Sequence, residues 1–224
     1  LNIKKTGFGN FSLSYSENNT LPEVNQLTSN FQLTDYRNFS QGTTYNKPLK
    51  NQTTTLNYYI YNDEKRFSIN TSVYYVNSKS IFNTSSNLTS DFNFNSYIQT
   101  KGSNSYNFNF SFVNYVRKLK LASKIETNNS WITSPINVNS TEFLNAKSYS
   151  NSIKYSGTTY FKSKINFDFG FSYNYFQSNF QGIKTNNTTK DAFLNINYKI
   201  SNTILAESNN SLYYVNNQSY YFNN

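Results

Sequence analysis

Hydrophobic and polar residues alternate strictly in several parts of the chain. From 165 to 175 every odd position is Ile, Phe or Tyr and every even position is Asn, Asp, Gly or Ser. A period of two places successive side chains on opposite faces of a β-strand. The alternation recurs at 106–112 and 192–200, in shorter form at 11–15, 56–60, 67–73, 119–125 and 149–155, and weakly from 204 to 215. The pattern predicts about nine strands, no helix and an all-β fold.

Charged residues in these segments fall in the register opposite the hydrophobic residues. One face of each strand could therefore meet hydrocarbon while the other meets water. We expect ten side chains to face lipid: Phe108, Phe110, Phe112, Ile165, Phe167, Phe169, Phe171, Leu194, Ile196 and Tyr198. We expect five polar side chains to face a lumen: Lys124, Glu126, Lys154, Asp168 and Lys199.

The links between the segments alternate in length. Tight polar links are expected at 62–65, 117–118, 162–163 and 202–203, and long links at 17–51, 77–100, 131–147 and 177–190. The alternation predicts an antiparallel up-and-down sheet with every tight turn at one end. Transmembrane β-barrels of the bacterial outer membrane have this layout, and about 9 to 11 residues are enough for a strand to span.

Composition narrows the possible functions. The chain has no His, Cys or Met, so disulfides, Cys/His zinc sites and His- or Cys-based catalysis are excluded, and we expect neither an enzyme nor a cofactor. Only 36% of the residues are hydrophobic, mostly Tyr and Phe, and no apolar run is long enough for a spanning helix. Because residue 1 is Leu, we expect a piece of a longer polypeptide, with 1–224 forming one partial barrel domain.

Other classes of protein share part of this pattern. A soluble β-sandwich, propeller or adhesin repeat would also alternate, although it would not need charges confined to one register. A disordered Asn-rich tract would not keep its aromatic residues in period. The net charge of +9 is compatible with nucleic-acid binding, but the lysines are spread over turns and polar positions, so no nucleic-acid partner is expected.

The long link at 17–51 is the main candidate for ligand or partner binding. This link contains more apolar residues than a flexible, solvent-exposed connecting loop would, so we expect it to fold over the barrel mouth. Its candidate contact residues are Pro22, Leu27, Phe31, Tyr36, Phe39 and Tyr45. The only Trp, Trp131, is expected to anchor at the membrane interface, and clusters of Tyr and Phe at strand ends suggest aromatic girdles.

A sequence motif follows the first long strand. Tyr15-Ser16 leads to a segment at 21–27 that reads LPEVNQL, and then come Gly42, Asn46 and Pro48-Leu49. The motif resembles the TonB-dependent-receptor-like outer membrane protein β-barrel family, in which Pro-x-x-x-Gln-Leu precedes Gly-Asn-Pro-x-Leu-x-Pro-Glu. The second half departs from that pattern, since Thr43-Thr44-Tyr45 follow Gly42 and Lys50-Asn51 replace Pro-Glu.

The resemblance implies the C-terminal part of a plugged barrel of roughly 22 strands in the outer membrane of a Gram-negative bacterium. It implies ligand uptake, contact with outer-membrane lipid, a surface lipoprotein on the long loops, and a periplasmic energy-coupling protein acting through a plug outside this piece. Two alternatives stay open. One is a structural or docking barrel subunit of an export or barrel-assembly complex, and the other is a soluble β-sandwich surface adhesin.

Overall fold

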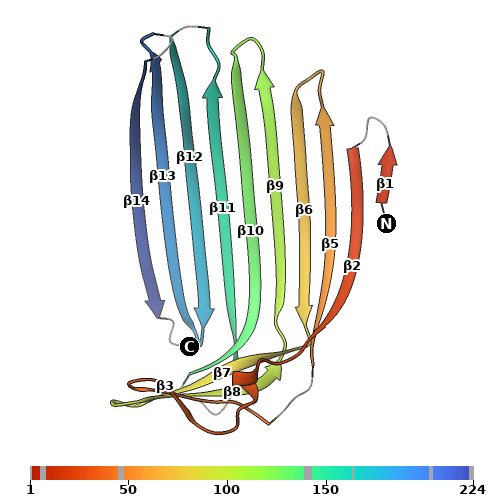
Figure 1. Cartoon of the computed structure of the whole chain (residues 1–224), viewed down its shortest axis with the longest axis vertical. Coiled ribbons are helices and arrows are strands. Elements are labelled where there is room, and N and C mark those ends of the chain that lie inside the picture. The colour runs from red at the N-terminus through yellow and green to blue at the C-terminus, as the bar shows by residue number, and fades with distance from the viewer. Residues whose placement is uncertain are drawn as a thin grey trace.

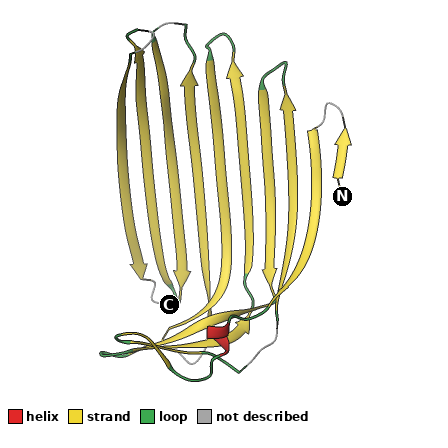
Figure 2. Cartoon of the chain, in the orientation of Figure 1, coloured by secondary structure: helices red, strands yellow, loops and turns green. Residues whose placement is uncertain are grey.

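The chain is all-β. The computed structural model describes residues 2–5, 9–44, 48–138, 143–162, 164–201 and 204–221, and the one helix among them is the single turn α1 (Val24–Leu27; Figure 2). None of the described helical residues forms a segment long and apolar enough to cross a membrane. The predicted all-β, antiparallel fold is confirmed.

A large antiparallel sheet makes up most of the molecule (Figure 1). Its strands lie in the order β1-β2-β5-β6-β9-β10-β11-β12-β13-β14. The bounds are β1 (Asn2–Lys5), β2 (Gly9–Thr20), β5 (Leu49–Asn62), β6 (Phe67–Ser78), β9 (Asn104–Val116), β10 (Leu121–Val138), β11 (Leu144–Thr159), β12 (Ile165–Phe180), β13 (Ile183–Lys199) and β14 (Leu205–Tyr221). Each of the nine predicted segments is one long strand of this sheet.

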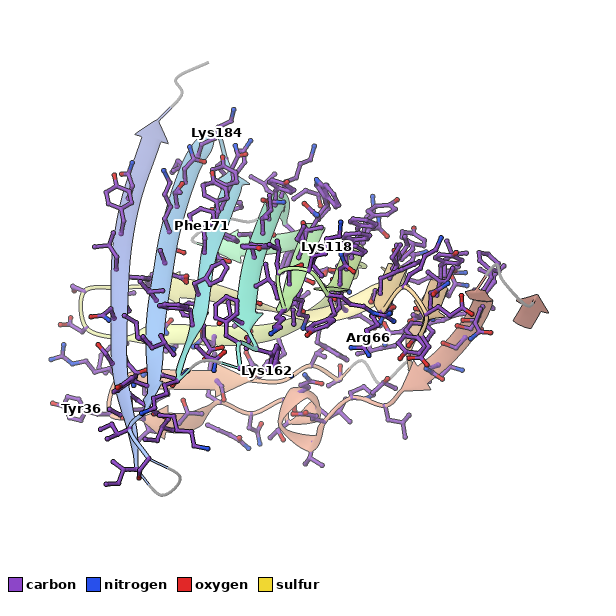
Figure 3. The ribbon with its side chains drawn as sticks, turned by 90° about the horizontal axis from the view of Figure 1, so that it is seen from above. Tyr36, Arg66, Lys118, Lys162, Phe171 and Lys184 are labelled. Carbon is purple, nitrogen blue, oxygen red and sulfur yellow. The ribbon has the colours of Figure 1, made fainter. Side chains whose placement is uncertain are left out.

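Four further strands form a small sheet across one end of the large one (Figures 1 and 3). They are β3 (Gln32–Asp35), β4 (Asn38–Gln41), β7 (Ser80–Leu88) and β8 (Asn93–Lys101). β4 pairs with β8 in parallel, and β7 pairs with the end of β10 at Asn137 and Val138. The strand prediction missed these four strands, because their polar sequences lack a hydrophobic alternation.

The predicted long links are partly wrong. The link at 177–190 is a two-residue hairpin turn, since β12 continues to Phe180 and β13 begins at Ile183. Gln181 and Gly182 have φ values of 51° and 79°, the conformation that tight hairpin turns require. The link at 131–147 shrinks in the same way, because β10 continues to Val138. Asn, Ser and Thr residues extend these strands by continuing the backbone pairing.

The four predicted tight turns lie together at the end of the large sheet away from the small sheet, at the top of Figure 1. Residues 63–66 join β5 to β6, and residues 117–120 join β9 to β10. The turns β11–β12 and β13–β14 are at the same end, although Ser163 and residues 202–203 lie outside the described part. The shared position of these four turns is therefore confirmed, but the prediction that every tight turn lies at one end is wrong, because the two-residue turn at Gln181 and Gly182 lies at the other end.

The turns are staggered along the sheet. A row of directly paired residues crosses six strand boundaries: Asn62, Phe67, Asn114, Ser123, Gly157, Phe169 and Leu194. Asn62 is the last residue of β5, whereas Leu194 lies five residues before Lys199, the end of β13. At about 3.4 Å per residue and about 4.8 Å between strands, the line of turns is inclined by about 30° to this row.

The large sheet is open in the described part of the chain. β1 and β14 end the order of strands, and no pairing joins them. Seen along the long strands, the sheet follows a curve (Figure 3). The edge strand β14, which is 17 residues long, offers unpaired backbone groups to another strand.

Candidate functional site

Register places the predicted lipid-facing residues on one side of the large sheet, here called the apolar face. Directly paired residues in antiparallel strands point to the same side. Phe112 of β9 pairs with Ile125, which pairs with Tyr155, which pairs with Phe171. The other predicted residues of β9, β12 and β13 share this face by the same pairings. All ten lie on it, and their contact with lipid stays a prediction.

The five predicted lumen-facing residues lie on the opposite side, the polar face. Glu126 pairs directly with Lys154, and Lys124 lies one position along on the same face of β10. Asp168 and Lys199 occupy the corresponding register of β12 and β13. Register therefore separates the two predicted sets completely, and their exposure to a lumen stays a prediction.

The apolar face has no cover. No hydrophobic side chain of the described residues is buried, and Phe171 keeps 45% of its surface exposed. The described residues place no second sheet over this face, as a β-sandwich would require. An uncovered apolar surface of this extent marks a site of association with protein or membrane.

A continuous row of aromatic side chains crosses the apolar face. Tyr75, Tyr106, Trp131 and Tyr149 are paired in succession across β6, β9, β10 and β11. The ring centroids are 4.7 Å apart for Tyr75 and Tyr106 and 5.2 Å apart for Trp131 and Tyr149. Sequence alone predicted Trp131 as an anchor and aromatic clusters at strand ends, but it did not place Tyr106 and Tyr149 in one row with Trp131, because register cannot be read from one strand.

A polar row lies directly beyond the aromatic row, on the side away from the tight turns. Its members are paired in succession from β2 to β13: Glu17, Gln52, Asn77, Asn104, Thr133, Lys147, Asn179 and Lys184. On β6, β9, β10 and β11 the apolar face therefore ends within one pair of residues.

Lys190 is a charged residue that lies on the apolar face rather than on the polar face. It pairs with Tyr173 and Tyr214 and so lies on the apolar face. Its Nζ is 5.8 Å from the centroid of the Tyr214 ring, within range of a cation–π interaction. Long lysine side chains can also extend from an apolar surface toward water.

Glu17, in the polar row, lies outside the apolar band and is held ionised. Lys50 forms an ion pair with it and Gln52 Nε2 donates to Oε2 at 2.9 Å, so the pKa of this carboxyl falls from 4.5 to about 2. A depressed folded-state pKa stabilises the protein above pH 4.5, and the contribution is lost as pH falls toward 2.

We therefore expect carboxyl NMR to give Glu17 a midpoint near pH 2, with Lys50→Gln raising it toward 4.5. The stability difference between the wild type and Glu17→Gln should shrink over the same pH window. A wild-type midpoint at the ordinary value would contradict the ion pair.

The polar face carries alternating charges near its middle. Lys124 Nζ is 2.7 Å from Glu126 Oε1, and Lys154 lies directly opposite Glu126. In the same row Ser172 donates to Asp191, which the sequence prediction did not single out. Asn197 Nδ2 donates to Asp168 Oδ2 at 2.9 Å. The three carboxylates Glu126, Asp168 and Asp191 therefore each have a side-chain partner on this face.

A depression of about 290 Å³ lies on the polar face, toward the small sheet. Its lining combines the ring of Phe176 with amide and hydroxyl side chains of the polar face: Asn107, Asn109, Asn128, Asn174, Asn187, Ser130, Ser150, Ser152 and Thr189. Such groups donate and accept hydrogen bonds without charge, which suits an uncharged polar ligand. The described residues contain no cluster of three His, Cys, Asp or Glu that could hold a metal.

The family-like motif folds as one unit. Glu23 N–H donates to Gln26 Oε1 at 3.0 Å and so caps α1. Gly42 N–H donates to Thr28 O, and a Cβ on Gly42 would lie 2.6 Å from Gln26 O. Glycine is therefore required where the two halves of the motif meet.

The predicted contact residues of 17–51 fall around the small sheet. Pro22 precedes α1, Leu27 ends α1, and Tyr36 lies in the β3–β4 turn. Phe39 stacks on Phe94 at 5.2 Å between centroids in a cluster that includes Phe31 and Phe92. Phe31 and Tyr36 are exposed. Tyr45 lies outside the described residues.

Comparison with protein-family models, with curated proteins and with solved structures finds no match to this chain.

Proposed function

We propose that this chain forms part of a transmembrane β-barrel of the outer membrane of a Gram-negative bacterium. The observation that carries the proposal is the uncovered apolar face, bounded on one side by the aromatic row and the polar row. Strands can span a bilayer only if a closed sheet satisfies every backbone group, so the proposal requires that the free edges of β1 and β14 be paired in the membrane.

The dimensions of the apolar face support this proposal. Ten residue steps separate Tyr106 in the aromatic row from Val116 at the turn end of β9. At about 3.4 Å per residue the band is about 34 Å long along β9. With the turn line parallel to the membrane the strands tilt by about 30°, so the band is about 29 Å thick at β9. Outer-membrane barrels have an apolar band of about 25 Å flanked by aromatic girdles and a tilt of about 35–45°.

The proposed activity is uptake of a ligand, as in the TonB-dependent transporters that the motif at 15–49 resembles. The polar face would line the lumen, and the depression around Asn109 and Asn174 suits an uncharged solute rich in hydrogen-bonding groups. Energy would come from a periplasmic coupling protein through a plug in another part of the polypeptide. No bond is made or broken in this role.

The native Trp131 provides a direct test, because it is the only tryptophan. In vesicles that contain brominated lipids, we expect quenching of its fluorescence about twofold stronger by bromine near the headgroups than by bromine at the bilayer centre. A control with Trp131→Phe should remove the signal. No quenching by any brominated lipid, with the protein staying in the aqueous fraction, would favour the soluble adhesin.

A second candidate is a docking subunit of an export or barrel-assembly complex. The aromatic cluster of Phe31, Phe39, Phe92 and Phe94 favours it, because this partly exposed cluster at the end of the barrel suits a partner protein such as a surface lipoprotein. Phe31→Ser with Tyr36→Ser should then release the partner without changing solute uptake. In the transporter, uptake itself should fall.

A further inference from the structure

The tight-turn end of the large sheet is strongly basic. Eight cationic residues lie there, here called the turn rim: Lys65, Arg66, Arg117, Lys118, Lys120, Lys162, Lys164 and Lys199. Only Asp63 and Glu64 among the described turn residues oppose them. Eight positive charges less two negative charges give +6, against +9 for the whole chain. Figure 3 looks onto this end, with Arg66, Lys118 and Lys162 labelled on three different hairpins.

The rim charges have no carboxylate partners within the described part of the chain. The two ion pairs found there are Lys50 with Glu17 and Lys124 with Glu126, both away from the rim. Seven of the eight rim residues are exposed, and Lys120 is half-buried. Like charges this close repel one another, so an anionic surface against the rim would stabilise the arrangement.

Hydrogen bonds between neighbouring hairpins hold the rim together. Tyr115 N–H donates to Arg66 O at 3.0 Å, which joins the first hairpin to the second. Lys120 O accepts from Tyr160 N–H at 2.7 Å, and Lys164 O accepts from Lys199 N–H at 2.7 Å. Each of these three hydrogen bonds involves a backbone atom of a rim residue. The backbones at the four turns are therefore held in fixed positions relative to one another.

The first two hairpins are also joined through a side chain. Arg117 Nη2 donates to Glu64 O at 2.9 Å. The guanidinium of Arg66 lies 5.3 Å from the centroid of the Tyr115 ring. Both arginines are therefore ordered, which lowers the entropy cost of binding an anion.

Exposed hydrophobic side chains alternate with the rim cations. Leu119 lies between Lys118 and Lys120 and is 59% exposed. Phe161 precedes Lys162, and Ile200 follows Lys199, both exposed. A surface that binds nucleic acid would place aromatic rings on a basic groove for stacking on bases. Aliphatic and aromatic side chains next to lysines suit the boundary between headgroups and acyl chains, where lysine stems lie along hydrocarbon.

We propose that the turn rim binds the phosphate headgroups of anionic phospholipid in the leaflet on the turn side of the membrane. The inference rests on the proposed membrane-spanning role and adds to it a lipid preference and an orientation. The apolar face ends at this rim, so the cations would lie at headgroup depth when Phe110 and Phe171 lie in hydrocarbon. Each lysine or arginine close to an anionic leaflet strengthens binding by about fivefold.

The test uses the protein reconstituted in phosphatidylcholine bilayers with spin-labelled phosphatidylglycerol or spin-labelled phosphatidylcholine as probe. We expect immobilised phosphatidylglycerol to be favoured about fivefold over phosphatidylcholine. The preference should fall below about twofold in 1 M NaCl, which needs no variant. The variant Lys118→Gln/Lys162→Gln/Lys164→Gln should show the same loss at low salt.

The matched control removes three exposed lysines at the far end, as Lys79→Gln/Lys101→Gln/Lys147→Gln. It has the same net charge as the rim variant and should keep the preference. Equal loss in both variants, or no preference in the parent, would overturn the rim as a lipid site. Absence of any immobilised lipid would instead overturn the membrane-spanning role, so the two failures are distinguishable.

Discussion

Replacing Phe110 by arginine is expected to lower the free energy of unfolding from a bilayer by about 2–4 kcal/mol. Phe110 lies near the middle of the apolar face, where it pairs with Thr71 and Thr127. A guanidinium at this position would have to leave water for hydrocarbon or distort the bilayer around it. Urea-induced unfolding of the protein in lipid vesicles, followed by Trp131 fluorescence, measures the difference.

The neighbouring Ser111→Arg is the matched control. Ser111 lies on the polar face, directly opposite Glu126, so an arginine there would reach water and a carboxylate. We expect the free energy of unfolding to change by less than about 1 kcal/mol. If Ser111→Arg were as destabilising as Phe110→Arg, the assignment of hydrocarbon to one face and water to the other would be wrong.

Gly102→Ala is expected to cost about 3 kcal/mol or more, because two backbone segments cross at this residue. A Cβ on Gly102 would lie 1.2 Å from Ser78 O, so the backbone itself would have to move. Gly102 N–H donates to Lys79 O at 3.1 Å, and Ser78 N–H donates to Ser103 O at 2.9 Å. These bonds hold the start of β7 and the end of β8 to the large sheet, so the small sheet should detach first.

Limited proteolysis between residues 80 and 101, together with the urea midpoint, would measure the effect of Gly102→Ala. The adjacent Ser103→Ala keeps the backbone hydrogen bond from Ser78 and should change stability by no more than about 0.5 kcal/mol. If the Gly102→Ala protein kept its urea midpoint and its small sheet resisted proteolysis, the two backbone segments could move apart without a loss of stability. The prediction would then be wrong.

The alternation of residues predicted the large sheet because the side-chain period of a strand is a local property. The stripe from Ile165 to Tyr175 defines both faces of β12 without reference to any other strand. The same reasoning failed where polar residues continue a strand. Residues 183–190 pair fully with β12 and β14, yet their Asn and Thr side chains carry no alternation.

Features of the candidate sites that lie within one strand could be read from the sequence, whereas features that depend on neighbouring strands could not. The ten apolar residues and the five charged residues lie on opposite faces of the sheet, because register preserves a face once two strands pair. The depression around Asn109 and Asn174 and the partner of Ser172, Asp191, were missed. Each depends on which strands are neighbours, and no single segment contains that information.

The sequence by itself determined that the chain forms amphipathic strands with polar turns, since alternation and turn residues act over a few positions. The tertiary structure alone decided how the strands line up. Register brought Trp131 into one row with Tyr106 and Tyr149, and inter-hairpin hydrogen bonds gathered Arg66, Lys120 and Lys164 into one rim. Register depends on pairing between distant strands, so only the assembled sheet fixes where the apolar band ends.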